Sequence, residues 1–259
     1  MTSLGIFDSG IGGFSVLSEV KKLLPKVQIF YIADDAHAPY GDKSEDYILA
    51  RAHELTKKLK EELKVDLIIL ACNTATAVAI ADLRKTYPDF PFVGIEPYLN
   101  IQKRFSSDDL SRRFVVLTTA RTGKSEKFLK LKEMLDPDHR IDHYGMERLA
   151  SLIEEAYYLG INDELKQKIC AELLPLKEKK YTHAILGCTH YPLISRFIEE
   201  FLAVECINPA PYVALRAKDL LLQAGKNLEA TSLSSYGFHF LSTKKNEWEI
   251  KMTSFFDLL

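Results

Sequence analysis

The feature that most constrains this chain is the alternation of short apolar runs with longer amphipathic segments. Runs such as residues 4–7 and 67–71 have the length of a strand and end at polar or glycine-containing turns. The segments between them repeat apolar residues at spacings of three and four, as one buried helix face requires. Strands that alternate with helices form parallel sheets through βαβ crossovers. The sequence therefore predicts an α/β fold.

The same patterns define the expected elements along the chain. Expected strands cover residues 4–7, 28–32, 67–71, 92–95, 114–117, 183–187 and 204–207. Expected helices cover residues 14–24, 47–63, 74–85, 125–134, 148–159 and 163–174, with a further amphipathic run at 213–224. The closing segment, residues 238–259, has a mixed pattern and no recognisable chemistry.

Two segments in different halves of the chain share one pattern: a strand, a small residue, a cysteine and a polar pair. They are Asp66-Leu-Ile-Ile-Leu-Ala-Cys72-Asn73-Thr74 and His183-Ala-Ile-Leu-Gly-Cys188-Thr189-His190. Coincidence between strand ends of one α/β protein is the alternative to a duplication. We expect two similar α/β domains related by pseudo-twofold duplication, at residues 1–97 plus 208–259 and 98–207. Ligands bind outside the carboxyl ends of parallel strands, so both cysteine turns would face one interdomain cleft.

Composition narrows the classes of function. The 259 residues carry a net charge of −2 and four cysteines. This charge provides no basic surface for a phosphate backbone or an anionic membrane, so we expect neither a nucleic-acid nor a membrane partner. No apolar run approaches the roughly 18 residues of a membrane helix, and the first residues lack the pattern of a signal peptide. Four dispersed cysteines do not make a disulfide framework, so we expect a cytoplasmic protein with reduced thiols.

Cys72 and Cys188 are the strongest candidates for chemistry. Each follows a predicted strand, and the residues after Cys72 begin a predicted helix, whose free amides and dipole favour a thiolate. A buried cysteine is commonly just a small hydrophobic residue. Packing alone, however, does not require the polar pair that follows each of these two. Cys170, in an amphipathic segment, and Cys206, in a strand, are expected to be structural.

Two other interpretations of the cysteines compete with this one. Thiolates and imidazole suit zinc, but Cys188 and His190 are only two positions apart and no second chelating cluster lies near Cys72. We therefore expect no metal. A hydrolase or transferase with Cys188 as the nucleophile would leave the matching Cys72 unexplained.

Two polar turns are further candidates for ligand contacts. The glycine-rich turn after Asp8 and Ser9 has Ser15 where a dinucleotide-binding fingerprint requires a third glycine. We expect this turn to bring Asp8, Ser9 and backbone amides to a small polar ligand. The loop from Asp34 to Gly41 has similar composition and is either a second ligand contact or a solvated turn.

Assembled in order, six blocks give the chain a specific resemblance to the cofactor-independent glutamate racemases, within the aspartate/glutamate racemase family. The resemblance extends over nearly the whole length and implies two similar α/β domains with the active site between them and no cofactor. The blocks are GIFDSGIGGFSVL (5–17), YIADDAHAPYG (31–41), ACNTATA (71–77), VGIEP (93–97), TTARTGKS (118–125) and LGCTHYPLI (186–194).

The resemblance also implies roles for individual residues. One thiol would remove the α-proton from one face of the amino acid while the other returns a proton to the opposite face. Cys72 would act on the D-isomer and Cys188 on the L-isomer. The implied catalytic residues are Cys72, Cys188, Asp8, Asp34, Glu154 and His190. The implied substrate contacts are Asp8, Ser9, Tyr40, Gly41, Asn73, Thr74, Thr189 and His190.

The function implied by the resemblance is conversion of L-glutamate to D-glutamate for peptidoglycan synthesis, by a cytoplasmic enzyme that is expected to be a homodimer. One alternative is the same chemistry on aspartate or another acidic amino acid. Another is a catalytically silent relative that binds acidic amino acids or a protein partner.

The chain departs from the family pattern at four places. His37 stands where arginine is usual, and Ala33 where glycine is usual. Met146-Glu147-Arg148 replaces a segment that contains Cys-Pro, and Asn208 replaces an aspartate. Both cysteine turns are intact, so we expect altered tuning of the site with its chemistry retained.

Overall fold

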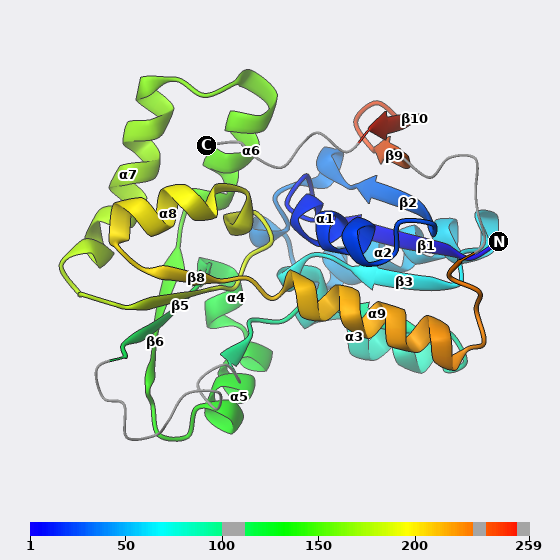
Figure 1. The fold of residues 1–259 in the computed structure, drawn as a ribbon, viewed down its shortest axis with the longest axis horizontal. Helices are drawn as coiled ribbons and strands as arrows, with labels where there is room; N and C mark the ends of the chain where they lie inside the picture. The colour runs from blue at the N-terminus through cyan, green and yellow to red at the C-terminus, as the bar shows by residue number, and fades with distance from the viewer. Residues whose placement is uncertain (100–111, 230–236, 253–259) are drawn as a thin grey trace. The chain divides into compact units, whose positions relative to one another are not determined.

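The computed structural model describes residues 1–99, 112–229 and 237–252, and these residues form two compact units, each built on its own sheet (Figure 1). The first unit contains Met1–Ile95 and the described residues from Ala210 onward, and the second contains the described part of Glu96–Pro209. The predicted α/β class is confirmed. The predicted domain limits stay a prediction, and their residues 100–111, 230–236 and 253–259 lie outside the described ranges.

The sheet of the first unit has the strand order β10-β9-β2-β1-β3-β4. All neighbouring pairs are parallel except β9 with β10. The central strands β1 and β3 are buried along their whole length, which explains their uninterrupted apolar sequences. The strands are β1 (Ser3–Asp8), β2 (Gln28–Ala33), β3 (Leu67–Leu70), β4 (Phe92–Gly94), β9 (Gly237–Ser242) and β10 (Glu247–Met252).

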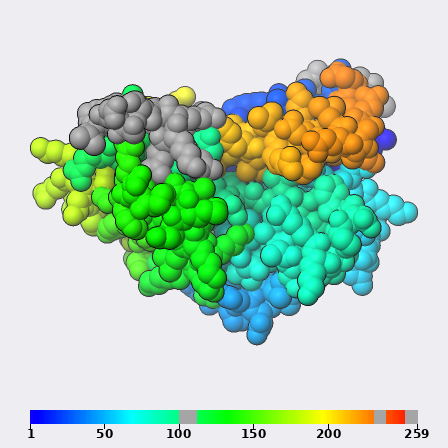
Figure 2. Space-filling view, turned by 90° about the horizontal axis from the view of Figure 1, so that it is seen from below, coloured from blue at the N-terminus to red at the C-terminus, as the bar shows by residue number. Residues whose placement is uncertain are grey.

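Helices cover both faces of this sheet in two pairs. Helix α1 (Phe14–Leu23) packs against α9 (Ala210–Gln223), and α2 (Glu45–Lys57) packs against α3 (Asn73–Thr86). Figure 2 shows a side of the unit on which α9, in orange, and α3, in cyan, are both visible. Short helical turns η1 (Asp35–His37) and η2 (Tyr40–Asp42) connect β2 to α2.

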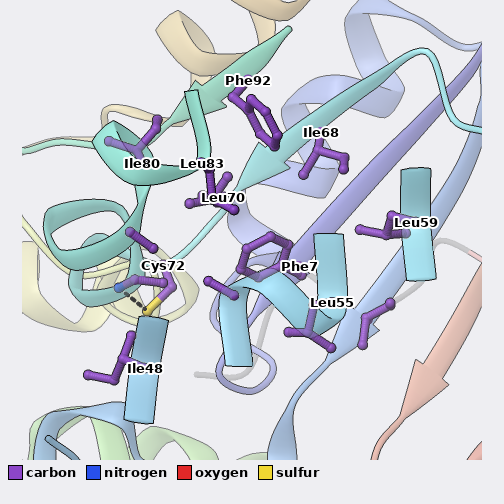
Figure 3. Close-up of a cluster of buried hydrophobic side chains, with 14 of the residues drawn as sticks. Phe7, Ile48, Leu55, Leu59, Ile68, Leu70, Cys72, Ile80, Leu83 and Phe92 are labelled. Atoms are coloured by element: carbon purple, nitrogen blue, oxygen red, sulfur yellow. Dashed lines mark hydrogen bonds between the residues drawn. The ribbon is translucent and has the colours of Figure 1, made fainter. Parts of the chain in front are cut away.

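The core between the sheet and the α2–α3 pair is a continuous apolar cluster (Figure 3). Phe7 and Leu70 from the strands meet Leu55 from α2 and Leu83 from α3. Successive strand residues point to opposite faces, so Ile68 and Leu70 face this cluster while Ile69 faces the other side. Cys72 belongs to the cluster at its margin, where the backbone leaves β3.

The second unit contains a parallel sheet with the order β6-β5-β7-β8. On one face, Phe114 and Ile185 pack with Phe128 of α5. The strands are β5 (Phe114–Thr119), β6 (Ile141–Met146), β7 (His183–Leu186) and β8 (Glu205–Ile207). The helices are α4 (Ala120–Lys124), α5 (Glu126–Leu135), α6 (Leu149–Leu159), α7 (Asp163–Lys177) and α8 (Ser195–Leu202), with the turn η5 (Tyr191–Ile194) between β7 and α8.

The two units share one strand topology. In each, the first strand in the chain lies between the second and the third, and the fourth lies beyond the third: β2-β1-β3-β4 and β6-β5-β7-β8. In each, the cysteine turn follows the third strand. A duplicated domain predicts this agreement, and it supports the repeat seen in the sequence.

Every predicted strand is present, with ends that differ by at most two residues. The prediction missed β6, β9, β10, α4 and α8. It was also wrong to extend one helix over residues 47–63, because α2 ends at Lys57 and continues as a π-helical turn, η3 (Lys58–Glu62). That wider turn is closed by the Leu63 N–H, which donates to the Lys58 carbonyl at 3.1 Å. Within the described ranges, no helix combines the length and apolar character required to span a membrane.

Candidate active site

Three strands of the first unit end side by side and place predicted site residues at one sheet edge. Asp8, the last residue of β1, is in register with Ala33 of β2, and Phe7 is in register with Leu70 of β3. Ser9 and Asp34 directly follow β1 and β2, and Cys72 follows β3 after one residue, Ala71. The carboxyl edge of a parallel sheet is where such folds bind ligands.

Cys72 begins a chain of polar contacts at this edge. It is the N-terminal cap of α3, and the Ala75 N–H donates to its sulfur at 3.5 Å (Figure 3). The thiol donates to Ser9 Oγ at 3.8 Å, and that hydroxyl donates to Asp8 Oδ1 at 3.5 Å. The Gly10 N–H donates to the same oxygen at 2.8 Å. The predicted residues Asp8, Ser9 and Cys72 therefore form a thiol–hydroxyl–carboxylate chain that can carry a proton.

The glycine-rich turn after Ser9 is shaped by close packing. A Cβ atom on Gly13 would lie 2.7 Å from Tyr31 Oη and 3.0 Å from the Cβ atoms of Asp8 and Ala71. No side chain fits there without displacing the strand ends. Tyr31 Oη also donates to the Gly10 carbonyl at 2.9 Å, which ties the turn to β2.

Asp34 and Tyr40 form a second buried group in the first unit. Tyr40 Oη donates to Asp34 Oδ2 at 2.5 Å, and Arg51 of α2 donates from Nε to Oδ2 at 3.0 Å and from Nη2 to Oδ1 at 2.6 Å. Burial raises the pKa of Tyr40, and the Asp34 carboxylate, its hydrogen bond and Cys72 raise it further. Tyr40 is therefore a neutral hydrogen-bond donor at all physiological pH values.

The remaining predicted contacts of the first unit differ in environment. Asn73 is 6% exposed, and neither its amide nitrogen nor its amide oxygen has a hydrogen-bond partner among the described residues. A buried amide without partners is costly, which points to a ligand in contact with it. Thr74, the next residue, is also buried. Gly41 is half-buried, and a Cβ atom there would contact nothing within 4 Å, so packing does not require this glycine.

Cys188 of the second unit lies in a similar turn with a different relay. It follows β7 through Gly187, where a Cβ atom would lie 2.7 Å from the Leu117 carbonyl oxygen. Its sulfur is 3.7 Å from His190 Nδ1, and His190 Nε2 is 2.6 Å from Glu154 Oε2. Glu154 reaches this position from α6, where Leu152 and Ile153 are buried.

Two shifted pKa values accompany this thiol–imidazole–carboxylate chain. Burial lowers the pKa of His190, but hydrogen bonds to Cys188 and Glu154, together with their charges, outweigh burial and raise it well above its ordinary value. The imidazole is therefore protonated at neutral pH and can donate to both partners. Burial, Cys188 and Glu172 raise the pKa of Tyr191, which thus stays a neutral phenol beside the thiol.

The structure groups the predicted residues by unit. Asp8, Ser9, Asp34, Tyr40, Gly41, Cys72, Asn73 and Thr74 belong to the first unit, and Glu154, Cys188, Thr189 and His190 belong to the second. Sequence reasoning missed Arg51 and Tyr191. Tyr191 lies inside the LGCTHYPLI block, so its place next to His190 could have marked it as a site residue. Arg51 lies on an amphipathic helix, where arginine is normally solvated, and nothing in the sequence selects it.

The other cysteines are placed as structural residues would be. Cys170 lies half-buried in α7, and Cys206 in β8. Burial raises the pKa of Cys206, and Glu199 and Glu205 raise it further, so this thiol remains protonated. Across the described ranges, no group of three or more histidine, cysteine or acidic side chains is arranged to hold a metal ion.

The departures from the family pattern lie at distinct places. His37 Nδ1 is 2.5 Å from Tyr47 Oη, and His37 Nε2 is 4.0 Å from Asp34 Oδ1. Met146 is buried at the end of β6, and the Arg148 N–H donates to Glu172 at 3.1 Å. Asn208 is half-buried in the connection between β8 and α9.

Comparison with known proteins adds independent information. A family model described as Asp/Glu/Hydantoin racemase matches residues 14–217. The glutamate racemase of Aliarcobacter butzleri (strain RM4018) is 37% identical over 231 residues, which cover 87% of this chain and 86% of that protein. The glutamate racemase of Pseudomonas entomophila (strain L48) is 36% identical over 220 residues, covering 84% and 81%.

Solved structures of the same kind share the fold. Escherichia coli glutamate racemase, in complex with L-glutamate and the activator UDP-MurNAc-ala, gives a TM-score of 0.80 at 27% identity, covering 93% of this chain and 88% of that one. Francisella tularensis glutamate racemase, in complex with D-glutamate, gives a TM-score of 0.75 at 26% identity, with the same coverage.

Proposed function

Because this chain belongs to the Asp/Glu/Hydantoin racemase family, we propose that it is a glutamate racemase that interconverts L- and D-glutamate without a cofactor. One observation carries the proposal: in each of the two matching sheets the turn after the third strand holds a cysteine, and each cysteine has its own route for a proton. Relatives named glutamate racemase, and their complexes with L- and D-glutamate, support glutamate as the substrate.

Racemisation through two thiols needs one thiolate and one thiol in each turnover. The thiolate removes the α-proton, and the thiol on the opposite face of the planar intermediate supplies a proton, which inverts the carbon. The reverse reaction starts from the opposite protonation states. In this proposal Cys72 acts on the D-isomer and Cys188 on the L-isomer.

The relays beside the thiols support this exchange of protons. Ser9 and Asp8 provide a neutral hydroxyl and then a carboxylate for the Cys72 proton. His190 and Glu154 provide a charged imidazolium for Cys188, because Glu154 holds the proton on the imidazole. The two thiols thus have different proton routes, a hydroxyl and a carboxylate beside Cys72 and an imidazolium and a carboxylate beside Cys188.

Binding groups complete the proposed site. Removal of an α-proton beside a carboxylate builds negative charge, which fixed hydrogen-bond donors stabilise. The unpartnered Asn73 amide, Thr74 and Thr189 are the donors assigned to the substrate, together with Ser9, the Tyr40 phenol and the Gly41 backbone. Asp8 and His190 contact the substrate as well. Asp34 is a second carboxylate, besides Asp8, in the part of the site that contains Cys72.

The test is proton NMR of the purified protein with L-glutamate, D-glutamate or L-aspartate in heavy water, with chiral analysis of the products. Loss of the α-proton signal with inversion, for glutamate alone, is the expected result. Exchange on aspartate and not on glutamate would overturn the substrate and keep the chemistry. Absence of exchange on all three, from folded protein with reduced thiols, would favour a silent relative that binds acidic amino acids or a protein partner.

The cellular setting follows from the same proposal. D-glutamate is the product that peptidoglycan synthesis requires, and four free cysteines suit the reducing cytoplasm. A homodimer is the assembly we propose, and sedimentation of the purified protein tests it: a monomer at all concentrations would exclude it.

A further inference from the structure

One half-buried arginine, Arg51, lies outside every motif recognised in the sequence and yet contacts a predicted site residue. We propose that Arg51 is a positioning residue of the Cys72 half of the site: its guanidinium holds Asp34, and Asp34 holds the Tyr40 phenol beside Cys72. The inference rests on the proposed function, since it assigns Arg51 to the racemisation site.

The contact between Arg51 and Asp34 is a two-point clamp. Nε and Nη2 of one guanidinium donate to different oxygens of one carboxylate, at 3.0 and 2.6 Å. This planar arrangement is specific to arginine, because a lysine ammonium offers a point charge without the fork. The Asp34 side chain is fully buried and that of Arg51 is 12% exposed. A carboxylate buried this deeply requires a partner of opposite charge.

Asp34, held by Arg51, in turn fixes the orientation of the Tyr40 phenol. Oδ2, the oxygen that accepts from Arg51 Nε, also accepts from Tyr40 Oη at 2.5 Å. Tyr40 is 1% exposed and belongs to the same apolar cluster as Cys72. With both oxygens accepting bonds from Arg51 and Tyr40, Asp34 orients the phenol and does not itself take the substrate proton.

His37 is the other cationic candidate near Asp34, and its geometry is poorer. Its Nε2 lies 4.0 Å from Oδ1, beyond a hydrogen bond, while its Nδ1 is engaged with Tyr47 Oη. Its side chain is also more exposed, at 29% against 12% for Arg51. Arg51 is therefore the group that balances the buried carboxylate.

A double-mutant cycle tests whether Arg51 acts through Tyr40. Arg51→Met is expected to lower kcat/KM by about tenfold or more, since small displacements of positioned groups have effects of this size. Tyr40→Phe is expected to do the same, and the double variant should lose no more than about twofold beyond the worse single variant. Losses that multiply would overturn the proposal. Arg51→Lys, which keeps the charge, should recover part of the activity.

Matched controls separate the clamp from general effects. Arg84→Met makes the same change at an arginine of the same unit that donates to the Phe92 carbonyl, and Glu54→Gln removes the exposed ion-pair partner of Arg51. Both should change kcat/KM by less than about twofold. A Glu54→Gln loss as large as that of Arg51→Met would assign the effect to the exposed pair and overturn the proposal.

A second measurement does not depend on racemisation. Iodoacetamide alkylation of Cys72 and Cys188, followed peptide by peptide with mass spectrometry, reports access to each thiol. Release of Tyr40 in Arg51→Met should speed alkylation of Cys72 at least about threefold and leave Cys188 unchanged, because Tyr40 packs with Cys72 alone of the two. Equal acceleration of both thiols, or of neither, would overturn the proposal. If Arg51→Met does not fold by circular dichroism, Arg51→Lys is carried through the same measurement.

The two experiments distinguish the possible failures. If the wild-type protein does not racemise glutamate, the proposed function fails, and the alkylation result still decides whether Arg51 positions Tyr40. If the wild-type protein is active but the losses of kcat/KM from Arg51→Met and Tyr40→Phe multiply in the double variant, only the proposed role of Arg51 fails.

Discussion

At the residue scale, the two candidate thiols differ in the groups that receive their protons. Cys72 donates to the Ser9 hydroxyl, a neutral group, whereas Cys188 lies beside His190, whose pKa is raised. Both thiols are nearly buried, at 6% and 7% exposure, so solvent does not determine this difference. The difference in neighbours predicts different pH dependence for the two directions of the reaction.

Loss of either thiol should abolish racemisation while the fold is retained. Cys72→Ala and Cys188→Ala remove a proton donor or acceptor, and a decrease of at least about 10³-fold in kcat is expected from general acid–base catalysis. Chiral chromatography of the product and circular dichroism of each variant check this result.

Cys170→Ala and Cys206→Ala are the matched controls for those thiol variants. Each should keep kcat within about twofold, since surface or structural substitutions away from the site have small effects. Substantial turnover by Cys72→Ala or Cys188→Ala, or a selective loss in either control, would contradict the assignment.

Glu154→Gln should move the alkaline limit of activity to lower pH. The imidazolium of His190 is present below its raised pKa and is lost as the pH rises through that value. Glu154 helps to raise this pKa, so its removal lowers the pH at which the imidazolium is lost. A pH profile of kcat/KM measures the shift.

The neighbouring acidic residue supplies the control for that pH profile. Glu155 is exposed on the same helix, and Glu155→Gln should leave the alkaline limit in place. If Glu154→Gln kept the wild-type profile, the relay from His190 to Glu154 would have no role in catalysis.

At the element scale, the strands β9 and β10 extend the sheet beyond the repeated topology. Strand β9 pairs with β2 in parallel, and the turn after β9 is held by Asp35 of η1. The Asp35 carboxylate accepts from Ser242 Oγ at 2.6 Å, from the Lys244 N–H at 3.0 Å and from Thr243 Oγ1 at 3.3 Å. One aspartate thus anchors the added strands next to the Asp34–Tyr40 loop.

Asp35→Ala should lower the free energy of unfolding by about 2–3 kcal/mol, because it leaves the buried Ser242 hydroxyl and two part-buried donors without their acceptor. Asp35 is only 3% exposed, so water does not replace the lost bonds. Chemical denaturation measures the change. Asp89→Ala, in an exposed turn, is the comparison and should change stability by less than about 0.5 kcal/mol. An equal effect in both variants would show that the anchor contributes nothing.

At the scale of the whole molecule, each unit has its own sheet and its own apolar core. The described residues of the second unit all lie within Glu96–Pro209, whereas those of the first come from two stretches separated by the second unit. A continuous stretch of about 110 residues is large enough to fold as an independent domain.

Residues 96–209, expressed alone, should therefore fold and melt cooperatively. Far-ultraviolet circular dichroism and a thermal melt test this, and Phe128→Ala in the same fragment should lower the midpoint because it opens a cavity in that core. The fragment should not racemise glutamate, since it contains only one of the two thiols. A non-cooperative melt would mean that the second unit depends on the first for its stability.

Local pattern in the sequence determined the class of fold, the candidate cysteines and all strands of the two repeated sheets except β6. These features follow from hydrophobic periodicity and from residues adjacent in the chain, so β1, β3 and β7 were predicted to within one residue. The polar pair after each cysteine could be recognised because its residues are adjacent to the cysteine in the chain. Asp8, Ser9 and His190 lie within the motifs that drew attention to them, and the structure places them beside the predicted thiols.

Tertiary structure alone decided what is paired across long sequence distances. Strands β9 and β10 have weak patterns of their own, and β9 joins the sheet through pairing with β2, about two hundred residues earlier in the chain. Glu154 resembles any solvated carboxylate of a helix until α6 places it 2.6 Å from His190. Arg51 likewise acquires its partner only when α2 packs over the loop that carries Asp34. A charged side chain on a helix face has no local signature of its partner, because the partner is set by packing.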